Sequence, residues 1–523
     1  MYPINSFCGV FLFFCVLILS TVIRRRRERR LANPKNLPYP PGPKPLPILG
    51  NLFDLARDNE AATYYQLAEQ FGDLFFLSVF GQNVLVVNSF QTANELFEKR
   101  SANYSDRGRS TMVHELMGWE WSFAHMRYGE NWRAHRKIFH QQFQQSVAPT
   151  YWPLQIKEAH SLLRRLLRAP QDLTVHMRHT ASSIVMSVIY GISIAPQNDP
   201  YVNMSEKALD GMTKAANPGA FLVDLVPLLL IYYSAWFPGA GFQRKAYEWK
   251  KACLEMRDAP FDYVHRALKS GRASSCFVTN AISNLDTKEP QPKSLDIIRQ
   301  CAGVAYAAGA ESTMSTLTTF ILAIVTNPEV QVKAQKELDR VIGHRRLPEF
   351  SDRPSLPYIN AIVKEVLRWN PVAPLGLPHM VTNDDEYKGY FIPAGTIVVG
   401  NSWRILHDPL LYQEPHKFNP DRFLNTAEGL QFSPVDPLSV SFGYGRRVCP
   451  GRYMAEAQVW ISIACMLSVF DITPGTDING EKMTFEPAFS SGMICHPLPF
   501  PYRIQARGEF ATALIDQTED IAA

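Results

Sequence analysis

The feature that most constrains the fold is a long apolar run at residues 294–327, which contains no proline. Pro328 follows it and suits the first turn of a further helix. At about 1.5 Å per residue, a helix of this length spans roughly 50 Å, enough to cross a whole domain. Its middle consists of small apolar residues, so other groups can approach its backbone closely. We therefore expect one large domain built around this helix.

The other segments predict a mainly α fold with a minor β portion. Residues 72–89 read as two apolar strands joined by a turn at residues 81–83, which is typical of a hairpin. A helix is expected at residues 355–369, before Pro371. Residues 387–403 read as short strands and turns. Most of the remaining chain is helical in pattern.

The N-terminal segment predicts a single-pass membrane anchor. Residues 7–23 carry no charge, and a run of arginines follows at residues 24–30. The apolar stretch is at the short end for a spanning helix, which needs about 20 residues. A cleaved signal peptide would carry its positive charge before the apolar run, not after it. Arginines after the span favour a cytosolic body, and they fit a nuclear or nucleic-acid signal poorly beside so hydrophobic a stretch.

Four regions follow from this organisation. They are a transmembrane anchor (7–23), a basic and proline-rich linker (24–49), one large domain (50–508) and a C-terminal tail (509–523). No linker-like composition interrupts the large domain. The formal net charge of +4 is small for 523 residues, so nothing predicts a nucleic-acid partner.

One of the eight cysteines has an unusual setting. Cys449 follows Arg446 and Arg447 in a glycine-rich loop that leads into an apolar helix. The two arginines and the backbone amides of the helix start are expected to lower the pKa of its thiol. It has no cysteine or histidine neighbour at the spacing of a metal cluster. A single thiolate is a known axial ligand of haem iron, whereas most of the other cysteines are expected to be buried and inert.

The loop resembles the cysteine-loop signature of the cytochrome P450 family, which runs Phe-x-x-Gly-x-Arg-x-Cys-x-Gly. The five fixed positions are Phe442, Gly445, Arg447, Cys449 and Gly451. The resemblance extends over residues 35–508. It implies the family's haem-domain fold, with haem b between the long helix and the loop and with its iron ligated by Cys449.

The resemblance also assigns a structural network. Glu365 and Arg368 lie three residues apart on the expected helix and therefore on one face. By resemblance they form a buried ion-pair network with Arg422. This network is expected to position the cysteine loop and to take no part in the chemistry.

Haem carries two propionates, and burying them requires hydrogen-bond donors. By resemblance these donors are Trp132, Arg136, His379 and Arg447. Trp132 and Arg136 lie four residues apart on an expected helix. For His379 a surface loop position is the alternative.

The long helix carries the sequence AGAEST at residues 308–313. It resembles the family's element beside the oxygen site, in which Gly309 leaves room for dioxygen. Glu311 and the hydroxyl that follows it are expected to deliver protons there. The family's usual threonine is Ser312 in this chain, so either Ser312 or Thr313 could supply that hydroxyl. For Glu311 a salt-bridge role is the alternative.

The resemblance implies an NADPH-driven monooxygenase that acts on an apolar small molecule. The chain has no GxGxxG fingerprint and no spare length for a flavin domain. Electrons are therefore expected from NADPH–cytochrome P450 reductase, with cytochrome b5 as a second donor, in the endoplasmic reticulum membrane. Three basic residues could form the docking face: Lys137, Arg446 and Arg452.

Residues 115–121 and 235–240, together with the cysteine loop, resemble enzymes of fungal secondary metabolism. These include the group related to O-methylsterigmatocystin oxidoreductase and the mushroom tryptamine hydroxylase; xenobiotic oxidation is a further possibility. Residues 110–125 and 485–494 are expected to line the substrate pocket. A haem-thiolate isomerase or dehydratase, or a non-catalytic haem protein, would not need Glu311 and Ser312.

Overall fold

The computed structural model covers most of the chain. The predicted anchor and nearly all of the arginine run lie outside the described residues. Those residues are 30–55, 60–216, 220–225, 241–285, 291–424, 435–477 and 479–520.

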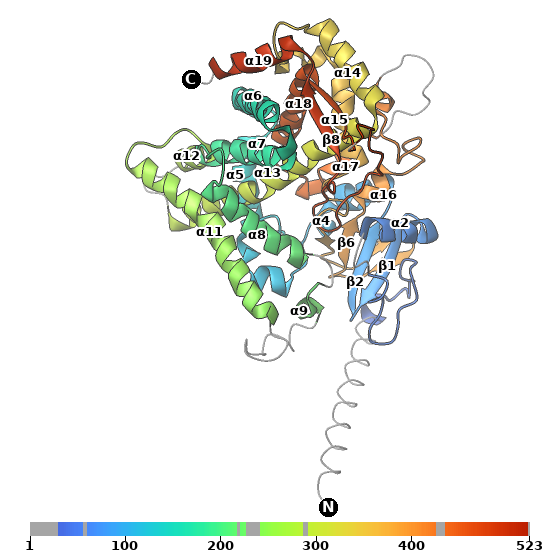
Figure 1. Ribbon diagram of the computed structural model, residues 1–523. Coiled ribbons are helices and arrows are strands. Elements are labelled where there is room, and N and C mark those ends of the chain that lie inside the picture. The colour runs from blue at the N-terminus through green and yellow to red at the C-terminus, as the bar shows by residue number, and fades with distance from the viewer. Residues whose placement is uncertain are drawn as a thin grey trace, which may run out of the picture.

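Helices make up most of the described chain (Figure 1). They are α2 (Glu60–Phe71), α3 (Phe90–Ala93), α4 (Ser101–Tyr104), α5 (Glu130–Phe143), α6 (Trp152–Arg168), α7 (Leu173–Tyr190), α8 (Pro200–Ala216), α9 (Leu222–Leu225), α11 (Gly241–Lys269), α12 (Phe277–Ser283), α13 (Pro292–Thr326), α14 (Pro328–Val341), α15 (Pro357–Trp369), α16 (Ser402–Leu406), α17 (Leu438–Ser441), α18 (Arg452–Val469) and α19 (Glu509–Asp520).

The strands form three small sheets. One is four-stranded in the order β1-β2-β6-β3, and the other two are the pairs β4-β5 and β7-β8. The strands are β1 (Leu74–Val79), β2 (Gln82–Val87), β3 (His379–Met380), β4 (Asp385–Tyr387), β5 (Tyr390–Ile392), β6 (Ile397–Gly400), β7 (Phe470–Pro474) and β8 (Tyr502–Ala506). The predicted mainly α class with a minor β portion is confirmed.

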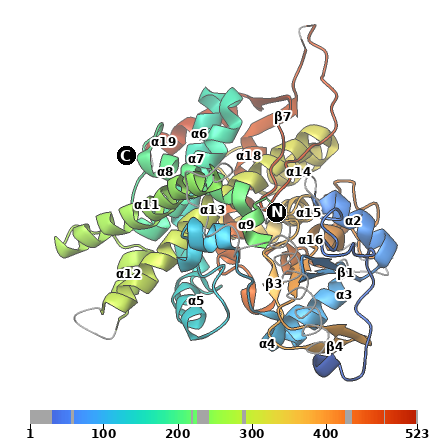
Figure 2. The ribbon, with the colours of Figure 1, turned by 90° about the horizontal axis from the view of Figure 1, so that it is seen from below.

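The helix α13 is the predicted central helix. It begins with a proline in its first turn and ends at Thr326, where Asn327 leaves helical geometry before Pro328. It is apolar all round, as expected of a helix buried in a domain core. Among the described residues it alone is long and apolar enough to cross a membrane, yet 78% of its most apolar window is buried inside the protein. It lies at the centre of the helical body (Figure 2).

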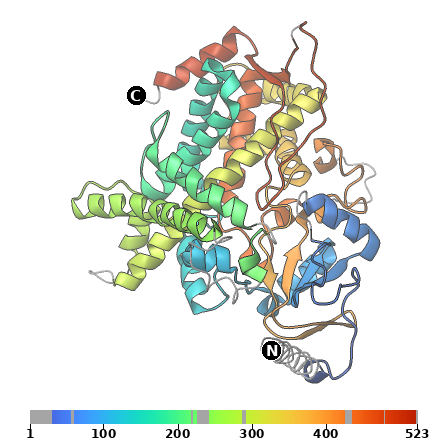
Figure 3. The ribbon, with the colours of Figure 1, turned by 60° about the horizontal axis from the view of Figure 1, so that its bottom comes forward.

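The predicted hairpin is also confirmed. Strands β1 and β2 pair antiparallel, and the turn between them contains Gly81 at a φ of 84°. The strand β6 pairs in parallel with β2, so two segments more than 300 residues apart lie side by side (Figure 3). This sheet, with α2 beside it, lies at one edge of the helical body.

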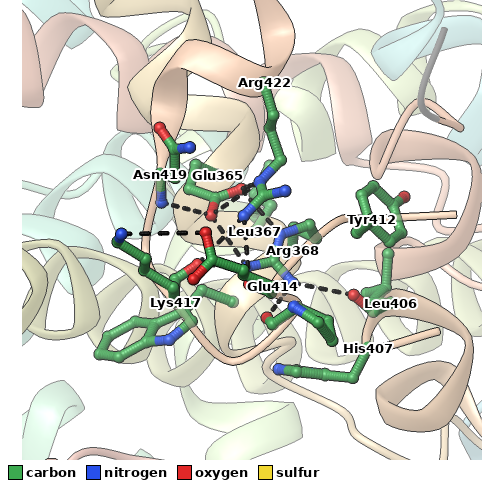
Figure 4. A network of polar contacts seen from close by, with 12 residues as sticks. Glu365, Leu367, Arg368, Leu406, His407, Tyr412, Glu414, Lys417, Asn419 and Arg422 are labelled. Carbon is green, nitrogen blue, oxygen red and sulfur yellow. Dashed lines mark hydrogen bonds and ion pairs between the residues drawn. The ribbon is translucent and has the colours of Figure 1, made fainter. Parts of the chain in front are cut away.

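The predicted ion-pair network on α15 is present, and its Glu365–Arg368 pair is fully buried (Figure 4). The guanidinium of Arg368 donates twice to the carboxylate of Glu365, at 2.7 and 2.8 Å. Its other three N–H groups donate to carbonyl oxygens of Leu406, Pro415 and Lys417. All five donors of this arginine are therefore used.

The network also bonds α15 to the segment that precedes the cysteine loop. Glu365 also accepts from Arg422 Nε at 3.2 Å and from the Asn419 amide at 2.7 Å. Further on, Ser441 Oγ donates to the Leu367 carbonyl at 2.9 Å. Removing one partner of a buried ion pair typically costs about 3–5 kcal/mol, so this network strongly fixes the loop against α15.

The C-terminal segment belongs to the same core. Residues 509–520 form α19, and its Ala511 and Ile515 are fully buried in the hydrophobic cluster that also contains residues of α6 and α18. The segment that the sequence suggested as a tail is therefore, over these residues, an integral helix of the domain.

Candidate functional site

The cysteine loop is a tightly bonded turn between α17 and α18. The Cys449 amide donates to the Phe442 carbonyl at 2.8 Å and closes the loop. Gly445 has a φ of 54°, and a Cβ at this position would lie 2.1 Å from the Phe97 carbonyl oxygen. Only glycine fits there, which gives a physical reason for this position of the motif.

Neighbouring groups act in opposite directions on the pKa of the Cys449 thiol. Burial raises its pKa, whereas the Gly451 amide and the cations of Arg136 and Arg452 act to lower it. The other described cysteines are all buried, while Cys449 is partly exposed. The expectation that Arg446 and Arg447 stabilise the thiolate is wrong, because both side chains point to other groups.

Arg447 bonds across to another segment of the chain. Its guanidinium donates to the carbonyls of Ser105, Phe123 and Met126 at 2.8, 3.3 and 2.7 Å. A buried guanidinium needs such acceptors, and they hold it away from the thiol. Arg446 is exposed and donates to the Tyr128 hydroxyl at 2.7 Å.

A cavity of about 620 Å³ joins the loop to α5. Arg136 and Cys449 both line it, so the structure brings these two predicted residues together. Trp132, one turn before Arg136, is buried against Arg447, whose guanidinium carbon lies 4.5 Å from the ring centroid. His140 and Phe143 of the same helix also line the cavity.

Several cations gather near this cavity, and the carboxylate that acts on two of them, Asp106, already forms an ion pair with Arg127 at 2.8 Å. Arg107 and Arg447 are 6% and 9% exposed, and Arg136 is partly buried. Burial lowers the pKa of all three, and repulsion adds to it: Arg447 acts on Arg107, Arg136 on Arg447, and Arg452 on Arg136. Asp106 opposes this lowering for Arg107 and Arg447, as Cys449 does for Arg136. Among the described residues, no carboxylate lies close enough to form an ion pair with any of these three arginines.

Such an arrangement fits a bound group with two carboxylates. Three N–H groups of Arg107 donate to carbonyls, those of Ala124, Leu377 and Pro378. Arg107 and Arg447 thus each engage three of their five N–H groups, and two remain. Carboxylates at these donors would offset the charge repulsion and the burial cost. The residues therefore fit haem, whose propionates supply those charges.

His379 is buried in β3 and is not the surface histidine of the alternative interpretation. Its Nδ1 bonds to the Tyr104 carbonyl at 2.6 Å, which leaves Nε2 for another partner. Burial and the charges of Arg107 and Arg447 hold the pKa of His379 well below its usual range. Because Nδ1 donates to a carbonyl, Nε2 of the neutral ring carries no hydrogen and can only accept. A propionate also accepts, so a hydrogen bond between them requires a proton on Nε2. The negative charge of the propionate would favour that protonation.

The predicted acid and hydroxyls lie in the middle of α13, outside the lining of the cavity. Ala308 is exposed although α13 is a core helix, so an open space adjoins this turn. Ser312 is partly exposed, and its Oγ donates to the Ala308 carbonyl at 2.9 Å. Thr313 is buried, 8% exposed. A Cβ at Gly309 would lie 2.7 Å from Val185 Cγ2, so this glycine is required for packing against α7.

Glu311 is largely buried, and burial raises its pKa while Arg178 acts to lower it. Its carboxylate lies 3.8 Å from Arg178 Nε, so the ion-pair partner of the alternative interpretation is present. Arg178 lies closer to Glu206, at 3.2 Å. A carboxyl with a raised pKa beside an open space is suited to proton transfer.

Three residues of this site were not predicted from the sequence: Arg107, Arg178 and His496. Arg107 lies in a loop whose sequence has no helical or strand periodicity, and in the sequence Arg178 is one polar residue of a helix among several. His496 approaches Glu311 from a segment far away in the sequence, with Nε2 at 3.6 Å from Oε2. No local signal identifies such a contact.

Comparison with known proteins agrees with this geometry. The family model described as Cytochrome P450 matches residues 40–500. The chain belongs to the cytochrome P450 family. It is an enzyme of the monooxygenase class, and its cofactor is haem held by a cysteine thiolate.

The relatives named in this comparison are fungal. A cytochrome P450 monooxygenase of Armillaria gallica is 42% identical over 92% of this chain and 95% of its own length. Cytochrome P450 monooxygenase 98 of Postia placenta is 40% identical, covering 97% of this chain and 96% of its own. Tryptamine 4-monooxygenase of Psilocybe cyanescens is 36% identical, covering 94% and 97%.

The cation cluster leads to a prediction on haem retention. Arg136→Gln removes a buried charge that faces the cavity. Because a hydrogen bond to a charged group contributes about 1.5–3 kcal/mol, haem affinity should fall roughly ten- to a hundredfold, measured by transfer of haem to apomyoglobin. Lys137→Gln, exposed on the next residue, is the matched control and should leave affinity unchanged. Equal affinity of the two variants would contradict the assignment.

Proposed function

We propose that this enzyme inserts one oxygen atom of O2 into an apolar small molecule, using NADPH electrons from a separate reductase. The observation that carries the proposal is Cys449, partly exposed at a cavity wall with Arg136. When bound, haem supplies the activation of O2, which electron donation from a thiolate promotes. Cys449 would ligate the iron, held in place by the bonded loop and by the network on α15.

The buried cations have the proposed task of orienting the cofactor. Arg136 and Arg447, with Trp132 packed against Arg447, would hold the propionates from the α5 side. Arg107 and His379 would hold them from the side of β3. These four polar groups come from segments far apart in the sequence, so they also fix the loop relative to the helical body.

Proton delivery is assigned to α13. Burial raises the pKa of Glu311, which favours its protonated form and suits it to donating a proton. Ser312 Oγ is partly exposed on the turn that carries Ala308, whereas Thr313 is buried. This difference favours Ser312 as the relay hydroxyl.

The electron donor is proposed to be NADPH–cytochrome P450 reductase, with cytochrome b5 as a second partner. Lys137 and Arg446 are exposed and Arg452 is partly exposed. Arg452 lines the cavity, Lys137 follows the lining residue Arg136, and Arg446 lies in the cysteine loop two residues before the lining residue Val448. An acidic surface of a partner would be complementary to them.

The substrate is proposed to belong to fungal secondary metabolism, as the fungal relatives suggest, or to be a xenobiotic. Trp119 and Trp121, in the segment expected to line the substrate pocket, are buried and stacked at 5.4 Å between centroids. Apolar side chains of this kind favour an apolar ligand.

The ligand assignment is tested by Cys449→His. The reduced wild-type protein with carbon monoxide should show the red-shifted Soret band of thiolate ligation, and the variant should lose this band even where haem stays bound. Cys465→Ala is the control, because Cys465 is fully buried in α18. An unaltered band in Cys449→His would show that another residue ligates the iron.

Residues 1–30 are proposed to anchor the protein in the endoplasmic reticulum membrane, with the domain in the cytosol. Their deletion should release the domain from microsomes and leave haem binding intact, because the described domain has its own core. Fractionation after carbonate and high-salt washing measures this release. Complete retention would place the main attachment elsewhere.

The proton relay is tested by counting product and hydrogen peroxide per NADPH, with a substrate found in a spectral-shift screen. Glu311→Gln should slow the coupled reaction by about 10²–10⁴-fold. Ser312→Ala should mainly release peroxide, while Ser312→Thr should couple at least as well as the natural enzyme. Thr313→Ala is the comparison. If Thr313→Ala releases peroxide and Ser312→Ala does not, Thr313 supplies the relay hydroxyl. No change in either variant, nor in the double variant, would refute a hydroxyl relay.

A further inference from the structure

The carboxyl of Glu311 lies between two different partners. Oε1 faces Arg178 Nε of α7 at 3.8 Å, and Oε2 faces His496 Nε2 at 3.6 Å. Both distances are too long for a hydrogen bond and short enough that a small side-chain shift would form one. Glu311 therefore forms a direct hydrogen bond with neither partner in the structure.

His496 is held at this place by its own loop. Its amide donates to Ser490 Oγ at 2.9 Å, and its carbonyl accepts from the Ser490 amide at 2.7 Å. The preceding carbonyl, of Cys495, accepts from Ser315 Oγ. Because Ser315 lies one turn of α13 beyond Glu311, this bond fixes the imidazole opposite the carboxyl.

His496 favours the protonated form of the Glu311 carboxyl, whereas Arg178 favours the carboxylate. Burial and the nearby charge of Arg178 lower the pKa of His496 to about 4, so the ring is neutral at physiological pH. A neutral imidazole can accept a hydrogen bond from a protonated carboxyl, whereas a guanidinium stabilises only the carboxylate. Arg178 is itself drawn toward Glu206, its nearer partner.

We propose that His496 is a positioning residue that holds the protonated form of Glu311, while Arg178 takes the carboxylate after the proton has left. This inference rests on the proposed role of Glu311 in proton delivery. Glu206 shares Arg178 and thereby keeps Glu311 from a permanent ion pair. The charged and titratable groups that face Glu311 are thus Arg178, Glu206 and His496.

The test is the protonation of Glu311, followed in the haem-loaded protein by the infrared carboxylic-acid band that Glu311→Gln abolishes. In His496→Ala the midpoint pH of this band should fall by about one unit, a tenfold change in the equilibrium. His496→Gln, which keeps an acceptor, should restore most of it. His496→Asn, polar but shorter, should behave like His496→Ala and serves if that variant folds poorly.

A double-mutant cycle sharpens the test. Arg178→Gln should raise the midpoint, and it should offset the loss in His496→Ala, since no cation is then left to favour the carboxylate. An unchanged midpoint in His496→Ala and His496→Asn, or no Glu311 band at any pH, would overturn the proposal. The carbon monoxide spectrum separates this from failure of the proposed function: an intact thiolate band with an unchanged midpoint refutes only the role of His496.

Discussion

An excess of buried positive charge near a cysteine is the constraint on which this site depends, because the one carboxylate that acts on Arg107 and Arg447, Asp106, is shared with Arg127. Arg107 and Arg447 are almost wholly buried, and each repels the other. In a medium of low polarity such charges are costly unless anions meet them. Three N–H groups of each arginine donate to carbonyl oxygens, which reduces this cost, and the other two N–H groups are left to donate to a ligand. The two carboxylates of haem would offset this charge, and on the proposed assignment haem binding would stabilise the packing of this region.

The scaffold around these charges explains how so many distant segments meet. The buried network of Glu365, Arg368 and Arg422 fixes the approach to the cysteine loop. Arg447 then ties the loop to residues 105–126 through three carbonyls. The helix α13 passes through the whole body, and Gly309 permits its close contact with α7. Through this contact Arg178 comes within reach of Glu311.

Much of this could be predicted from the sequence, because periodicity, proline positions and a local motif are encoded within short stretches. These signals predicted the central helix and the hairpin, whereas the network on α15 followed from the resemblance to the family. The direction of a long side chain is not encoded locally. Arg447 turns away from the thiol because buried carbonyls compete for it, whereas Arg452, counted only as a surface charge, faces Cys449. The contacts of Arg107 and His496 depend on loops that only the folded chain brings together.

We propose that Cys449 and the buried cations together hold haem between α13 and the cysteine loop. An experimental structure of the haem-loaded protein tests it most directly. Iron should be bonded to Cys449 Sγ, and both propionates should lie within hydrogen-bond distance of the buried arginines, with Arg136 and Arg447 among the donors. Iron ligated by a different side chain, or propionates directed to solvent while Arg107 and Arg447 stay unpaired, would contradict it.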